Sequence, residues 1–170
     1  MPGQASAIAV SVSGANSRGS VGASDQGGGR YTATYTPEKA GTDQVQVRVS
    51  GTAVPGSPFA SAVQAGDADP GSSQAVVPAC VESDNLPVRI TITAFDAFGN
   101  RVTRGGDDFQ IRVSPGTSFN PTDNGDGTYT AQLNLDIGVF RIDITLDGEP
   151  IKGSPYQILV PFPFFGCQDG

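Results

Sequence analysis

The stretch GEPIKGSPY at residues 148–156 decides the fold, because its pattern has already occurred once, as GTAVPGSPF at residues 51–59. The two stretches are 97 residues apart, from residue 51 to residue 148. Upstream of each lies another matching pair, DQGGGRYTA at 25–33 and DNGDGTYTA at 123–131. Self-similarity at a fixed period indicates tandem structural repeats. The chain therefore contains two copies of one module.

The second copy alternates apolar and polar residues over short runs that are bounded by Gly, Pro, Asn and Asp. This pattern is typical of strands with one buried face, and no window has the spacing of a regular helix. Seven short strands in about 95 residues predict an all-β fold, a two-sheet immunoglobulin-like sandwich repeated in tandem. The expected strands are 73–77, 88–94, 109–113, 118–122, 129–133, 140–146 and 156–160.

The first copy is shorter, because its counterpart of strand 109–113 already lies at 8–12. Two of the seven strands have no counterpart before it, and an incomplete sandwich exposes half of its core. We expect the first copy to be the back half of a repeat in a longer array, with strands supplied by another chain as the alternative. The predicted domains are a partial repeat at 1–64, a complete repeat at 65–163 and a tail at 164–170.

Composition and charge exclude several classes of enzyme and binding partner. The chain has no His, so that a Ser-His-Asp triad or a His-ligated metal site is not possible. Seventeen acidic against ten basic residues give a net charge of −7 without a basic cluster, which disfavours nucleic acid as a partner. The longest apolar run, 158–165, is too short to span a membrane. We expect no enzyme activity and no cofactor or metal.

The two cysteines, Cys80 and Cys167, are 87 positions apart, which is not the dense spacing of a disulfide-rich secreted module. We expect both to be free thiols, with an intermolecular bridge through Cys167 as the alternative. Residues 1–15 lack the basic and apolar regions of a signal peptide, and no Asn begins a glycosylation sequon. A cytoplasmic, cytoskeletal location is therefore favoured over an extracellular or cell-surface one.

Several polar and glycine-rich segments resemble known sites but are better explained as turns. The segment 123–127 resembles a calcium loop, yet neither end supplies the carboxylate that an EF-hand needs, so we interpret it as a hairpin turn. Asp107 and Asp108 would project to opposite faces of a strand and do not make an acid–base pair. The glycine runs at 27–29 and 105–106 neither open a helix nor precede Lys-Ser/Thr, which excludes phosphate loops.

In combination, these motifs resemble the filamin-type immunoglobulin-like repeat over roughly residues 4–161. The resemblance implies a non-enzymatic scaffold or protein-interaction module of a larger protein, which spaces neighbouring repeats and contributes to the cytoskeleton. No actin-binding region accompanies the repeats, so actin binding is not carried over. The alternative is an extracellular cell-adhesion protein of the gamete-surface type. The matching motifs are DAFGN at 96–100, GGDDF at 105–109, DNGDGTY at 123–129, GEPIKGSPY at 148–156 and PEKAG at 37–41.

The resemblance also implies where protein or peptide partners would bind. In this family a ligand commonly adds as an extra strand, by β-augmentation, beside the strand at 109–113 and against the strand at 118–122. We expect 109–113 to be a free sheet edge, and Arg112 to favour an acidic residue in the ligand. Small residues make the first copy easier to approach. The expected binding residues are Gln110, Arg112, Ser114 and Phe119 in the second copy and Ala9 and Ser11 in the first.

Overall fold

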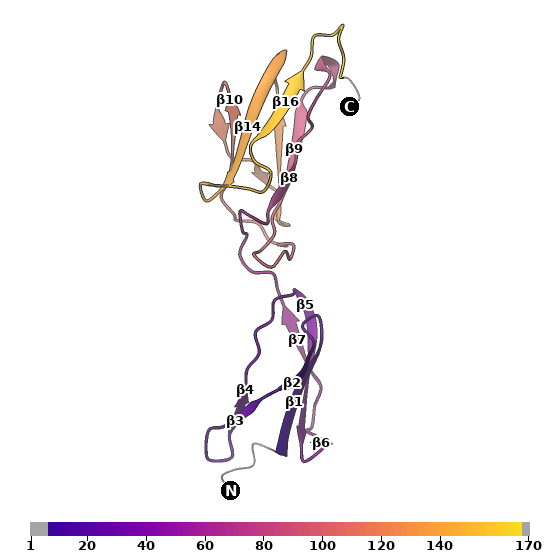
Figure 1. Cartoon of the computed structure of the whole chain (residues 1–170), viewed down its shortest axis with the longest axis vertical. Coiled ribbons are helices and arrows are strands. Elements are labelled where there is room, and N and C mark those ends of the chain that lie inside the picture. Colours follow the sequence, from indigo (N-terminus) through magenta and orange to yellow (C-terminus); the bar gives the residue numbers. More distant parts are fainter. Residues whose placement is uncertain (1–6, 168–170) are drawn as a thin grey trace. The chain divides into compact units, whose positions relative to one another are not determined.

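The computed structural model describes residues 7–167 of the 170-residue chain, and its long elements are all β-strands. The chain divides into two compact units, Met1–Gln64 and Ala65–Gly170, called unit 1 and unit 2 below. Figure 1 shows the strands of each unit. The predicted all-β fold is confirmed.

Unit 2 is a sandwich of two antiparallel sheets. One sheet has the order β11-β10-β14-β15 with β16 paired to β14, and the other has the order β12-β13-β9-β8. A 3-10 turn at Ser83–Asn85 precedes β9. The strands are β8 (Gln74–Val76), β9 (Val88–Thr93), β10 (Phe109–Ser114), β11 (Ser118–Phe119), β12 (Thr122–Asp123), β13 (Thr128–Leu133), β14 (Gly138–Leu146), β15 (Glu149–Pro150) and β16 (Tyr156–Val160).

The seven predicted strands are present in unit 2, but the one predicted at 118–122 is split. Its first part, β11, pairs with β10, and its second part, β12, pairs with β13 in the other sheet. The segment therefore crosses from one sheet to the other rather than forming a single strand.

The core of unit 2 follows from the alternation along its strands. Ile142 and Ile144 of β14 are fully buried, as are Ile90 and Ile92 of β9 from the facing sheet. Tyr129 of β13 is 2% exposed and joins the same cluster. Eighteen buried hydrophobic residues of the described chain form this cluster, which is large enough to hold the two sheets together.

Unit 1 contains one five-stranded sheet and one separate hairpin. The order in the sheet is β2-β1-β5-β6 with β7 paired to β5, and β3 pairs with β4. Val10 of β1 lies opposite Val47 of β5, as Ile111 of β10 lies opposite Ile144 of β14. The strands are β1 (Ile8–Gly14), β2 (Arg18–Val21), β3 (Ala23–Asp25), β4 (Tyr31–Ala33), β5 (Gly41–Val49), β6 (Thr52–Ala53) and β7 (Phe59–Val63).

Unit 1 has little hydrophobic core, since its described residues include no counterpart of β8 or β9. Val10 and Val12 are its buried hydrophobic residues. Val45 and Val47 of β5 are only half-buried, and Phe59 of β7 is 46% exposed. The same alternation that buries β14 in unit 2 therefore leaves β5 partly exposed.

The repeated Gly-Ser-Pro motif makes the same hydrogen bond in both units. The Val47 backbone N–H donates to Ser57 Oγ, and the Ile144 backbone N–H donates to Ser154 Oγ, each over 2.9 Å. Each serine side chain thereby accepts a hydrogen bond from a backbone N–H of the long strand, β5 or β14. A buried backbone N–H needs such a partner. The sequence pattern shows the repeated serine, but its partner becomes evident only in the fold.

The repeated Asp-containing hairpins are also built alike. Asp25 Oδ1 accepts from the Gly27 N–H, and Asp123 Oδ1 accepts from the Gly125 N–H, each over 2.8 Å. These contacts confirm the interpretation of 123–127 as a turn closed by an aspartate side chain. At Gly127, with φ of +78°, an added Cβ would lie 1.9 Å from the Val102 carbonyl oxygen. Only glycine fits there.

Candidate interaction face, linker anchor and disulfide

The outward face of β10 and β14 carries the predicted polar residues. Gln110 and Arg112 are exposed, Ser114 is half-buried, and they alternate with the buried residues of β10. In the pairing with β14, Arg112 lies opposite Asp143 and Ser114 opposite Arg141. These side chains line a shallow groove of about 610 Å³. The structure therefore brings Gln110, Arg112 and Ser114 together on one face.

An ion pair already occupies part of this face. Arg141 Nη2 donates to Asp143 Oδ1 over 2.8 Å, and Nε lies 3.1 Å from both carboxylate oxygens. This hydrogen bonding raises the pKa of Arg141 and lowers the pKa of Asp143, with a smaller contribution to Asp143 from the charge of Arg112. A carboxylate in a ligand would have to compete with Asp143 for Arg112.

The expectation of a free edge at strand 109–113 is wrong. β11 pairs with β10 at Ile111–Phe119 and Arg112–Ser118, and the Val113 N–H donates to the Thr117 carbonyl over 2.9 Å. The chain turns back immediately after β10, so the first residues of the next segment cover its edge. An approaching strand would have to displace β11.

Phe119 does not share the outward face. Its partner in the pairing is Ile111, which is fully buried, and paired residues project to the same side of a sheet. Phe119 is half-buried and packs against the core cluster. The sequence grouped it with Gln110 because it lies in the neighbouring strand, but its side chain contributes to the core.

In unit 1, the corresponding face lies on β1. Ala9 is exposed and Ser11 is half-buried, whereas Val10 and Val12 point to the other side. The edge of β1 is also covered, because β2 pairs with it at Val10–Val21 and at Val12–Arg18. Both predicted docking edges therefore carry a strand of their own unit.

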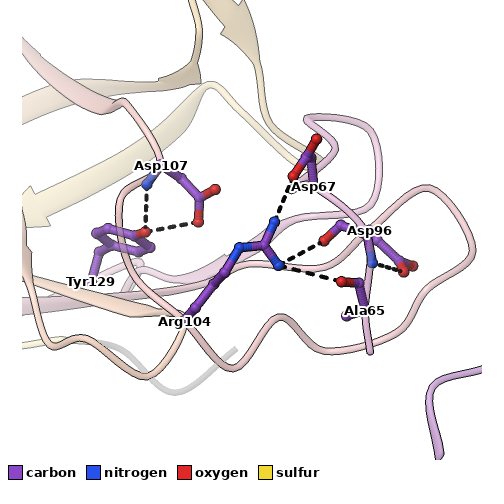
Figure 2. A network of polar contacts seen from close by, with 7 residues as sticks. Ala65, Asp67, Asp96, Arg104, Asp107 and Tyr129 are labelled. Atoms are coloured by element: carbon purple, nitrogen blue, oxygen red, sulfur yellow. Dashed lines mark hydrogen bonds and ion pairs between the residues drawn. The ribbon is translucent and has the colours of Figure 1, made fainter. Parts of the chain in front are cut away.

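A polar network holds the first residues of unit 2 to its body (Figure 2). Arg104 Nη1 donates to the carbonyls of Ala65 and Gly66, each over 3.3 Å. Arg104 Nη2 lies 2.5 Å from Asp67 Oδ1. Asp96 Oδ2 accepts from the Gly66 N–H over 2.9 Å. Two loops of the sandwich thus fix the segment that enters unit 2.

Asp96 is 2% exposed and fully hydrogen-bonded. Burial by itself raises its pKa, but hydrogen bonds from the Asn100 side chain and from the N–H groups of Gly66, Asn100 and Phe98 outweigh this, so the pKa lies below its usual value. Asp96 therefore stays ionised at neutral pH. It anchors two backbone segments, the one at Gly66 and the loop that contains Phe98 and Asn100.

Tyr129 and Asp107 form a second contact in Figure 2. The Tyr129 hydroxyl donates to Asp107 Oδ2 over 2.7 Å and accepts from the Asp107 N–H over 2.9 Å. Burial, together with this carboxylate, raises the pKa of Tyr129 to about 12. Asp107 therefore secures the loop before β10, whereas Asp108 is exposed.

The prediction of two free thiols is wrong, because Cys80 and Cys167 form a disulfide within the chain. Cys80 lies in a short segment that runs parallel to β16: the Leu159 N–H donates to the Ala79 carbonyl, and the Val81 N–H donates to the Leu159 carbonyl. The chain continues beyond β16 to Cys167, which is bonded to Cys80. This parallel pairing brings together two cysteines that the sequence separates by 87 positions.

Among residues 7–167, no group of three or more His, Cys, Asp or Glu side chains is arranged to hold a metal ion. None of the helical segments in this range has the length and apolar character of a membrane span.

The family comparisons distinguish the two units. The model described as invasin, domain 3, matches residues 69–158, which is more than half of the chain. The Filamin/ABP280 repeat model matches residues 2–60. The chain belongs to the invasin domain 3 family and carries a filamin-type repeat before that domain. The predicted resemblance to filamin-type immunoglobulin-like repeats is thus confirmed.

Curated relatives point to the same repeat family. Filamin-C of Mus musculus is 32% identical over 139 residues, which cover 80% of this chain and 5% of the relative. Filamin-A of Drosophila melanogaster is 32% identical over 128 residues, which cover 74% of this chain and 6% of the relative. The chain spans about a twentieth of the length of these filamins, so the similarity concerns the repeat module.

Solved structures share the fold of this invasin-family chain. InvD of Yersinia pseudotuberculosis superposes with a TM-score of 0.56 and 25% identity, covering 95% of this chain and 50% of InvD. FdeC, an Escherichia coli adhesin, superposes with a TM-score of 0.59 and 24% identity, covering 89% of this chain and 51% of FdeC. The filamin and invasin families contain immunoglobulin-like repeat domains with a structural role. This chain is a repeat module of that kind.

Proposed function

We propose that this chain is a non-enzymatic spacer in an extracellular adhesin, in which immunoglobulin-like repeats hold a binding region away from the cell. The observation that carries the proposal is the Cys80–Cys167 disulfide. Disulfides persist in oxidising compartments such as the cell exterior and are rare in the cytosol. The adhesion alternative is therefore preferred over the cytoskeletal scaffold that the sequence favoured.

The family match supports the same choice. Residues 69–158 match a domain of invasin, and FdeC, which shares the fold, is an Escherichia coli adhesin. The filamin match of unit 1 is compatible with this assignment, because the repeat type itself does not specify a compartment.

Two covered strand edges in one sheet of unit 2 also suit a spacer in an array. β11 covers β10, and the segment around Cys80 covers β16. Exposed strand edges promote pairing between neighbouring copies, so covered edges keep tandem repeats separate. The Arg104 and Asp96 contacts keep residues 65–67 bound to unit 2, which shortens the free linker before it.

The proposal is tested in cells that express the natural gene, with antibodies against unit 2. We expect staining of intact cells, and a linked Cys80–Cys167 peptide in non-reducing peptide maps of the purified protein. Staining that requires permeabilisation, together with free thiols, would instead support the cytoskeletal scaffold.

A second candidate function is peptide binding by strand addition at β10. It is favoured by the shortness of β11, which pairs with β10 at only two positions, so a longer ligand strand would form more pairs than it displaces. Gln110, Arg112 and Ser114 would then contact alternate side chains of the ligand. Ala9 and Ser11 would do the same on β1, where β2 would have to be displaced.

A peptide array probed with unit 2 tests this second function. Arg112→Glu should abolish binding of acidic peptides, whereas Arg89→Glu, on the exposed face of β9, should leave it unchanged. Binding that survives Arg112→Glu would place the site elsewhere. Absence of binding by the unmodified protein would leave the spacer role alone.

A further inference from the structure

The disulfide changes the path by which tension crosses unit 2. Cys80 follows β8, and Cys167 follows β16. Strands β9 to β16 all lie between the two cysteines in sequence. A pull applied along the chain can therefore pass from Cys80 directly to Cys167 through the S–S bond.

The bond also joins two segments that already lie side by side in unit 2, the one around Cys80 and the one that follows β16. Ala79 and Val81 are hydrogen-bonded to Leu159 of β16 in parallel orientation. Tension between the residues before Cys80 and those after β16 would otherwise load these hydrogen bonds together, along the strand direction. The covalent bond connects the same two segments and does not yield when hydrogen bonds do.

We propose that the Cys80–Cys167 disulfide makes unit 2 a nearly inextensible link, because it carries stretching force past the strands between the two cysteines. This inference goes beyond the spacer proposal, since it concerns the covalent path of the chain in any location. Once the segment before Cys80 has detached, the strands β9 to β16 are no longer loaded, and their unfolding does not lengthen the chain.

The segment before Cys80 remains under tension. It is attached by the pairing of β8 with β9, by the Asp96 and Arg104 contacts, and by the Lys152 N–H, which donates to the carbonyls of Pro70 and Ser73. If these contacts break, about 15 residues from Ala65 onward are released, which adds roughly 50 Å at full extension. Reduction of the disulfide would release a further 87 residues, about 300 Å.

Unit 1 provides an internal reference, because both cysteines of the sequence lie in unit 2. Its extension under force is therefore independent of the redox state. Any difference in released length between the oxidised and the reduced protein therefore arises in unit 2.

The experiment is single-molecule stretching of the full chain, held at its two ends, with and without dithiothreitol. The dithiol is oxidised to its cyclic disulfide while the S–S bond of the protein is reduced to two thiols. We expect the total contour length released to be about 300 Å greater after reduction. Equal lengths in the two states would overturn the inference, as would full extension of unit 2 in the absence of reductant.

The double variant Cys80→Ser/Cys167→Ser is the matched control. It should extend fully with or without dithiothreitol, and a redox-dependent length in this variant would contradict the assignment. If the variant does not fold, the comparison of oxidised and reduced natural protein still decides. The result is independent of the cell-staining experiment, so the spacer proposal and this inference can fail separately.

Discussion

Units 1 and 2 carry the same sequence motifs, yet they bury them very differently. Ile142 and Ile144 of unit 2 are fully buried, whereas Val45 and Val47, which precede them by the repeat period of 97 residues, are half-buried. Both pairs lie on the central strand of a five-stranded sheet. The difference comes from the second sheet, which has four strands in unit 2 and two in unit 1.

The comparison shows that alternation specifies a strand and its inward face but not the burial of that face. Burial requires a facing sheet, and β8 and β9 supply half of that sheet in unit 2. The hydrogen bonds of the shared motifs form in both units, at Ser57 and at Ser154. Local hydrogen bonding therefore reproduces the fold of each motif without providing its hydrophobic stability.

The largest expected effect is seen when the units are separated. Residues 65–170 alone should fold and unfold cooperatively, because they contain both sheets and the disulfide. Residues 1–64 alone should not, since two buried valines cannot offset the entropy of ordering the chain. The measurement is NMR amide dispersion with thermal denaturation, and a dispersed spectrum from monomeric 1–64 would remove the basis of the comparison.

The next largest difference is expected between equivalent core substitutions in the two units, measured by the free energy of unfolding. Ile142→Ala should lower the free energy of unfolding of the main transition by roughly 2 to 5 kcal/mol, because it leaves a cavity in a packed core. Val45→Ala, at the equivalent position of unit 1, should leave this transition unchanged. Thr145→Ala, on the other face of β14, should cost less than about 1 kcal/mol. Urea denaturation followed by circular dichroism measures all three, and equal losses at 142 and 145 would refute the strand parity.

The sequence predicted the strands well because each depends on local information, namely alternation and the turn residues around it. It predicted Gln110, Arg112 and Ser114 on one face for the same reason. It failed at Phe119 and at the edge of β10, because the segment from Ser118 to Asp123 divides between two sheets. Which sheet a short segment joins depends on the whole sandwich.

The disulfide could not be predicted from spacing either. Cys80 and Cys167 come together because the segment 79–81 runs parallel to β16, a long-range pairing without a local sequence pattern. The same holds for the hydrogen bond from Gly66 to Asp96, which joins residues 30 positions apart, whereas Asn100 lies within the local motif. The motif at 96–100 could be recognised, but its function as an anchor of the linker required the fold.

Glycine substitutions in the repeated hairpin compare the two units at one added atom, the alanine Cβ. Gly127 and Gly29 both have positive φ, but an added Cβ overlaps the Val102 carbonyl only at Gly127, and Gly29 faces open space. Gly127→Ala should destabilise unit 2 by roughly 1 to 3 kcal/mol. Gly29→Ala should not shift the main transition. Similar melting curves for Gly127→Ala and the unmodified chain would mean that the β13 hairpin can move away from Val102.

The smallest effect is expected at the two tyrosines of the repeated motif. Tyr129→Phe keeps the ring in the core but removes the hydrogen bond to Asp107, which should cost about 0.5 to 1.5 kcal/mol at pH 7. Tyr31→Phe should have no effect on the main transition, because Tyr31 is only half-buried in unit 1.

The pH dependence of stability tests the environment of the Tyr129 hydroxyl. The pKa of Tyr129 is raised from 10.0 to about 12 in the folded chain, so the folded state favours the protonated phenol. The stability it contributes is complete below pH 10 and is lost as the pH rises toward 12. Between these values the unmodified chain should lose stability faster than Tyr129→Phe, in urea melts at successive pH values. Parallel curves for the two proteins would show that burial and Asp107 do not raise the pKa of Tyr129 in the folded chain.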